Sequence, residues 1–114
     1  SASTHQQIMT AQRHHDELDS ADGTESKLEL FDKMLMSLED AKSAIRDAIS
    51  ENLKKGGAAD EGKAASLQLL RNYVQGTALL WTRERDLLLV ETLQGRLKTG
   101  ETGRKAAKAE DVVK

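Results

Sequence analysis

The chain has 114 residues and a formal net charge of −2, and only 3% of its residues are aromatic. It contains no cysteine, which excludes disulfides, thiolate catalysis and thiolate metal sites. The charge provides no bulk positive field that would recruit nucleic acid or an anionic membrane, and no apolar run approaches the roughly 20 residues that a membrane-spanning helix needs.

Helices are the expected secondary structure, because proline is absent and β-branched residues are few. The first helix is predicted over about residues 4–18. A narrow apolar face recurs there at spacings of three and four: Ile8, Ala11, His15 and Leu18. The segment DSADGTES then breaks the periodicity and separates this helix from the next.

A second helix is predicted over about residues 25–55, because apolar residues keep to one side and charged residues to the other. The apolar side consists of Leu28, Phe31, Leu35, Leu38, Ile45, Ile49 and Leu53, with Ala41 and Ala48 beside them. Lys54 and Lys55 in the last turn suit the helix dipole. Gly56 and Gly57 follow, and they suit a left-handed C-cap.

The third helix is predicted over about residues 63–98 and carries a wider apolar surface than one partner helix can cover. One stripe consists of Leu67, Leu70, Val74, Ala78, Trp81 and Leu88. An adjacent stripe consists of Leu80, Leu87, Val90 and Leu97. Glycines at 100 and 103 are expected to end this helix, and a further helix is predicted to start near 108–114.

These segments predict an all-α fold, in which a long antiparallel helical hairpin carries a short N-terminal helix, similar to a three-helix bundle. We expect residues 1–114 to form a single helical domain that is a fragment of a longer chain. Burying one leucine fully is worth ~1.5–3 kcal/mol, so a hairpin that leaves several of them wet is expected to complete a bundle by association. The predicted association face consists of Leu67, Leu70, Val74, Trp81 and Leu88, and self-association of this fragment is expected.

Gly57, Gly62 and Lys63 have the spacing that opens a phosphate-binding P-loop. A P-loop needs a strand before its glycine-rich turn and a serine or threonine after its lysine. Here the preceding segment is predicted as a helix, and Ala64 follows the lysine. We therefore predict an interhelical turn in which Lys63 is a solvated surface charge.

The histidines do not form a metal site. His14 and His15 are adjacent and point about 100° apart on a helix, and pairing His14 with Glu17 leaves a zinc site two ligands short. Paired acids such as Glu39 and Asp40 lie on an exposed helix face without a pocket. We predict no metal, no cofactor and no enzymatic activity.

The charged run from Arg83 to Asp86 lies between two apolar segments. Alternating charge is usually a solvated face, but Arg85 follows Trp81 by four residues and can stack on its indole. Trp81 itself is predicted to anchor helix packing or a subunit contact. Arg83 and Arg85 are also candidates for contact with RNA or another protein.

Three stretches, in this order, resemble the middle region of the 68-kilodalton protein subunits of the eukaryotic signal recognition particle. They are KLELFDKMLMSLEDAKSAIRD at 27–47, SLQLLRNYVQGTALLWTRERDLLL at 66–89 and AEDVVK at 109–114. The matching residues are Leu30, Phe31, Met34, Leu35, Asp40, Ala41, Leu67, Gln68, Leu70, Tyr73, Arg85 and Asp86. Gly76 and Trp81 depart from the family pattern.

The resemblance implies a non-catalytic helical scaffold that supports ribonucleoprotein assembly for cotranslational targeting of secretory proteins to the endoplasmic reticulum. Its implied partners are the 72-kilodalton subunit and the particle RNA. The implied location is cytoplasmic, with a nuclear or nucleolar stage during particle assembly. The family's arginine-rich RNA-inserting segment and its partner-binding segment are expected outside these residues. The residues alone also leave open an unrelated helical adaptor or coiled-coil hairpin that mediates protein–protein interaction.

Overall fold

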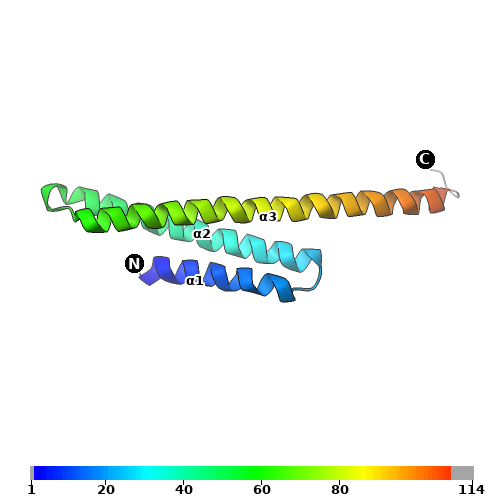
Figure 1. The fold of residues 1–114 in the computed structure, drawn as a ribbon, viewed down its shortest axis with the longest axis horizontal. Helices are drawn as coiled ribbons and strands as arrows, with labels where there is room; N and C mark the ends of the chain where they lie inside the picture. Colours follow the sequence, from blue (N-terminus) through cyan, green and yellow to red (C-terminus); the bar gives the residue numbers. More distant parts are fainter. Residues whose placement is uncertain (1, 109–114) are drawn as a thin grey trace. The chain divides into compact units, whose positions relative to one another are not determined.

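The computed structural model describes the backbone of residues 2–108 (Figure 1) and the side chains of residues 4–97. Three α-helices follow one another along the chain: α1 (Ala2–Asp16), α2 (Gly23–Lys54) and α3 (Glu61–Lys108). Two short 3-10 turns connect them, η1 (Glu17–Ser20) and η2 (Gly56–Ala58). The described residues contain no strand, and the short N-terminal helix packs against the two longer ones. The predicted all-α fold is confirmed.

The chain divides into two compact units, Ser1–Arg83 and Glu84–Lys114. The first unit holds α1, α2 and the N-terminal part of α3, and the described residues of the second are the remainder of α3. The single domain expected over residues 1–114 stays a prediction.

The end of α3 differs from the one expected near residue 98. The helix continues through both glycines, 100 and 103, to Lys108. A glycine costs about 1 kcal/mol relative to alanine inside a helix, which weakens the helix without forbidding it, and no proline stops this segment. Apart from Lys108, the further helix predicted near 108–114 lies outside the described residues.

The reversal between α2 and α3 is held by two side chains. Gly56 takes a left-handed conformation with a φ of 57°, which confirms the predicted C-cap. The buried Asn52 side chain donates to the backbone carbonyl of Asp60 at 3.0 Å and accepts from its N–H at 3.1 Å. The Asp60 carboxylate in turn accepts from the N–H of Lys63 at 3.0 Å and so caps the start of α3. The turn is therefore specific and short.

The hydrophobic core of the first unit is a seam between its helices. Its buried apolar residues are Ile8 and Ala11 of α1, Phe31, Met34, Leu38, Ala41 and Ile45 of α2, and Leu67, Val74 and Trp81 of α3. The residues of α2 alternate at spacings of three and four, and those of α3 repeat every seven, as in a coiled coil. Met34 is fully buried, although the apolar side predicted for this helix did not include it. Leu53, which that prediction included, is exposed.

Two side-chain contacts join α1 to the N-terminal part of α3. The rings of His15 and Trp81 stack with centroids 5.0 Å apart and planes 15° apart. Three residues earlier on α1, the Gln12 amide donates to the Tyr73 hydroxyl at 2.7 Å. His15 is half-buried and belongs to the apolar face that the periodicity predicted for this helix. These contacts help to position α1 on the longer helices.

Candidate interaction surfaces

The first surface is the inner row of α3, which we define as Leu67, Val74 and Trp81. These side chains are 7%, 0% and 5% exposed, respectively. Leu70 and Leu88, the other members of the predicted association face, are half-buried. The inner row is covered within the chain itself, so it holds the helices together. Association through the predicted face as a whole stays a prediction.

Another side of α3 carries apolar residues that the first unit leaves exposed. We define this outer row as Leu69 and Leu80, which are 70% and 52% exposed. Three helical turns separate them, so they lie on one side of the helix. Tyr73 lies between them and is 46% exposed, but its hydroxyl accepts the hydrogen bond from Gln12 of α1. The second unit has its own exposed apolar residues: Leu87, Val90, Leu93 and Leu97. Leu80, Leu87, Val90 and Leu97 are the adjacent stripe that the sequence predicted, and this stripe is exposed.

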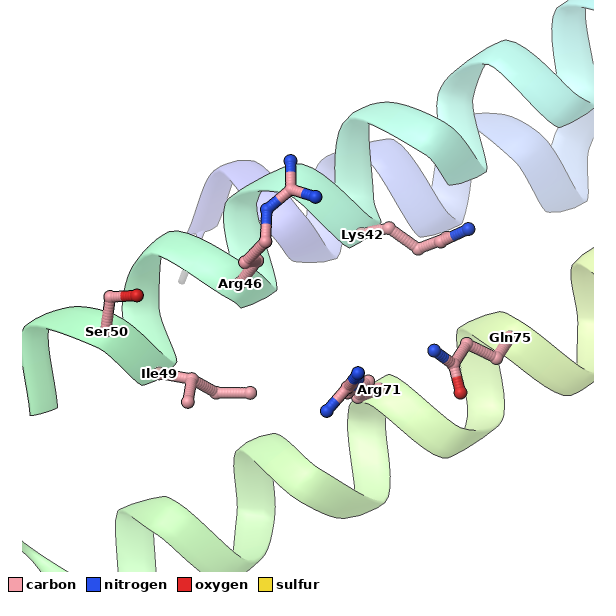
Figure 2. A pocket seen from close by; sticks show the side chains of 6 residues that line it. All are labelled: Lys42, Arg46, Ile49, Ser50, Arg71 and Gln75. Atoms are coloured by element: carbon pink, nitrogen blue, oxygen red, sulfur yellow. The ribbon is translucent and has the colours of Figure 1, made fainter. Parts of the chain in front are cut away.

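The third surface is a groove between α2 and α3, lined at one end by basic side chains. This end is a hollow of about 220 Å³. Its lining residues are Lys42, Arg46, Ile49, Ser50, Arg71 and Gln75. Figure 2 shows Ile49 pointing from α2 toward Arg71 on α3, while the Arg46 guanidinium extends away from α3. Both walls of this end thus carry basic side chains, and α2 adds the aliphatic Ile49.

The other end of the groove is largely apolar. It is a hollow of about 410 Å³ that shares Lys42 and Gln75 with the basic end. Its remaining lining residues are Leu35, Glu39, Ala78, Leu79 and Thr82. Both hollows lie between α2 and α3 in the first unit and share two lining residues, and we call them together the α2–α3 groove.

The charges of the groove are unevenly balanced. Lys42 pairs with Glu39 at 3.3 Å, one turn earlier on α2. Arg46 donates to the Ser43 hydroxyl at 3.1 Å, and neither it nor Arg71 forms an ion pair with a described residue. The basic end is therefore a local positive site on a chain whose net charge is −2.

The predicted contact arginines are placed differently. Arg83, the last residue of the first unit, is exposed, and Arg85 in the second unit is half-buried. Neither lines the α2–α3 groove. Their contact with RNA or protein stays a prediction.

The P-loop spacing belongs to a helix-capping turn. A helix, α2, precedes the glycines, and the Asp60 carboxylate already occupies the N-terminus of α3 where a phosphate would bind. Over the described residues, no group of three or more His, Asp or Glu side chains could hold a metal ion. In the same part of the chain, none of the helices combines the length and apolar character needed to cross a membrane.

Two features of these surfaces were not predicted from sequence. The hydrogen bonds of the Asn52 side chain to the Asp60 backbone could not be predicted, because an asparagine near a helix end has several ordinary roles. The sequence did hold a partial signal for the α2–α3 groove, since Leu35, Lys42 and Ile49 are spaced by seven and so share one side of α2. That side borders the core stripe, and the sequence offered no way to tell a groove wall from a core position.

Comparison with known proteins bears on the identity of the chain. The profile of one protein family, described as RNA-binding signal recognition particle 68, matches residues 1–114. No curated protein and no solved structure gave a match. A family match over the whole length does not agree with an unrelated helical adaptor, and it confirms the resemblance found in the three stretches. The chain belongs to the RNA-binding signal recognition particle 68 family.

Proposed function

We propose that this region is a non-catalytic helical scaffold of a signal recognition particle protein, which supports assembly of the ribonucleoprotein through the outward faces of its helices. The observation that carries the proposal is the exposure of large apolar side chains on α3 beside a completed inner row. Burying one such leucine would contribute ~1.5–3 kcal/mol. Clustered exposed apolar residues mark interaction surfaces in soluble proteins.

The proposed partners are the particle RNA and the 72-kilodalton subunit. The family description supports RNA as a partner of the protein as a whole. The exposed apolar residues support a protein partner, since buried interface centres are apolar. A cytoplasmic location and a role in cotranslational targeting to the endoplasmic reticulum complete the proposal.

A structural role fits the surfaces better than catalysis does. The two hollows of the first unit are open grooves lined by aliphatic, amide, hydroxyl and basic side chains and by one carboxylate, that of Glu39. Neither contains a histidine next to a hydroxyl nucleophile, or the pair of carboxylates that acid–base catalysis commonly uses.

Reconstitution of the particle with the full-length protein tests the proposal. The variant Leu69→Asn with Leu80→Asn makes the outer row polar. The matched control, Met36→Asn with Leu53→Asn, changes two exposed apolar residues of α2. We expect the outer-row variant to co-sediment less with particle RNA and the 72-kilodalton subunit, while the control assembles normally. Normal assembly of both variants would contradict a scaffold role for this face.

A further inference from the structure

The α2–α3 groove has the length, the charge and the apolar side chains of a binding site for another helix. We infer that it binds an acidic amphipathic α-helix of a protein partner. The inference rests on the proposed scaffold role, and it adds a second surface, apart from the outer row, together with the chemistry of what docks there.

The two walls of the groove extend along several helical turns. On α2 the wall runs from Leu35 to Ser50, and on α3 it runs from Arg71 to Thr82. At 1.5 Å per residue the α2 wall is roughly 22 Å long, which is about four turns of a docked helix. Helix-in-groove recognition uses apolar anchors one or two turns apart on such a helix.

Apolar side chains are available at both ends for such anchors. Ile49 points into the basic end (Figure 2). At the other end Leu35 and Ala78 are half-buried, and Leu79 is exposed. A helix with apolar residues on one face would cover these side chains and gain the free energy of removing them from water.

The charge of the groove specifies the other face of the partner. Arg46 and Arg71 stand on opposite walls of the basic end, and no acidic side chain lines that end. Glu39, the acid at the apolar end, is already paired with Lys42. Charge complementarity therefore calls for acidic residues on the part of the partner helix that lies over the basic end.

The same cations would attract RNA phosphates, but the rest of the groove does not suit RNA. No aromatic side chain lines either hollow, so unpaired bases have no aromatic ring on which to stack. At the apolar end the cation in the lining, Lys42, is already paired with Glu39, so the attraction for a phosphate backbone is weak there. An amphipathic helix uses both ends of the groove, whereas RNA would use only one.

Site-specific photocrosslinking in the assembled particle tests the inference. The photoreactive residue p-benzoylphenylalanine is placed at Gln75, which lines both hollows, in the full-length protein. The control position is Lys33, an exposed residue nine positions before Lys42 and so on the opposite side of α2. We expect Gln75, and not Lys33, to crosslink to a protein segment with acidic and apolar residues at helical spacing.

Charge reversal then tests the chemistry of that contact. Arg46→Glu with Arg71→Glu should lower the yield of the Gln75 crosslink by at least about tenfold, because like charges would face each other. Lys33→Glu with Lys55→Glu, which changes the net charge equally, should leave the yield unchanged. Both arginines are exposed, so folding should persist. If the reversal does unfold the protein, Arg46→Gln with Arg71→Gln is read by the same crosslink.

Three outcomes would overturn the inference: a crosslink from Gln75 to RNA, equal crosslinking from Lys33, or no crosslink from Gln75. None of them affects the outer row, so the scaffold proposal would stand if the outer-row variant still failed to assemble. Conversely, a charge-sensitive Gln75 crosslink with normal assembly of the outer-row variant would keep the groove and reject the outer row.

Discussion

The inner and outer rows of α3 consist of similar apolar residues, but one row is buried and the other is exposed. Leu67, Val74 and Trp81 are buried, whereas Leu69 and Leu80, only one or two positions away from them, are exposed. The two rows lie on one helix and differ only in the side of it that they occupy. Apolar character alone therefore does not decide which side packs inside the chain.

The difference comes from the number of helices available to cover α3. In the first unit α2 contributes buried apolar residues at alternating spacings of three and four. From α1, the His15 ring stacks on Trp81 of α3. These two helices cover one side of α3 in the first unit and leave another side exposed. The wide apolar surface predicted from sequence therefore divides into a buried row and an exposed row.

The largest expected effect is at Trp81. Trp81→Ala should lower the free energy of unfolding by about 3–5 kcal/mol, since it removes a large core side chain and the stack with His15. Its neighbour on the outer row gives the matched control, because Leu80→Ala should change stability by no more than about 0.5 kcal/mol. Urea unfolding followed by circular dichroism measures both. Equal losses would mean that the two rows are not distinct.

The next effect is expected at the turn. Asn52→Ala should cost about 1–3 kcal/mol of stability, because it removes the two hydrogen bonds that the buried Asn52 side chain makes to the Asp60 backbone. The exposed Ser50→Ala is a suitable control two residues away. Thermal unfolding measures the change. If Asn52→Ala is as stable as the control, water replaces the two hydrogen bonds and the turn does not depend on the Asn52 side chain.

A smaller effect is expected from the cap of α3. Asp60→Ala removes the carboxylate that accepts from the Lys63 N–H and leaves the Asn52 hydrogen bonds in place, because those are made to the Asp60 backbone. The expected loss is about 1 kcal/mol. Asp60→Asn should restore most of it, since asparagine caps helices comparably, and a failure of that rescue would argue against capping.

The smallest effect on folding is expected on the outer row, where the readout is association. Leu69→Asn with Leu80→Asn should leave the unfolding midpoint nearly unchanged, because both side chains are exposed in the folded chain. Self-association at high concentration should weaken, and sedimentation velocity measures this. A chain that is monomeric at every concentration would show that the outer row does not pair with itself.

Much of the fold followed from the sequence because local signals agreed with one another. The absence of proline, the spacings of three and four, and Gly56 after two lysines were sufficient for the helices and the left-handed cap. The end of α3 was not predicted correctly, because the glycines at 100 and 103 weaken a helix by an amount that the surrounding residues can offset.

The surfaces were harder to predict. Sequence periodicity found both stripes of α3 but assigned Leu67, Val74 and Trp81 to association, because it could not show that α1 and α2 together cover them. The basic end of the α2–α3 groove is lined by Arg46 and Arg71, which are 25 positions apart in the sequence. Only the register of the two helices places them on the same hollow. Such pairings are properties of packing.

The division of α3 into a covered and an open row is tested most directly by the reactivity of introduced thiols. The chain has no cysteine, so Val74→Cys and Leu80→Cys each give it a single thiol, on the inner and outer row respectively. Alkylation in native buffer should proceed at Leu80→Cys as fast as in the unfolded chain. At Val74→Cys it should be slower by at least about a thousandfold, because the thiol reacts only after the core opens. Equal rates at the two positions would contradict the assignment of inner and outer rows.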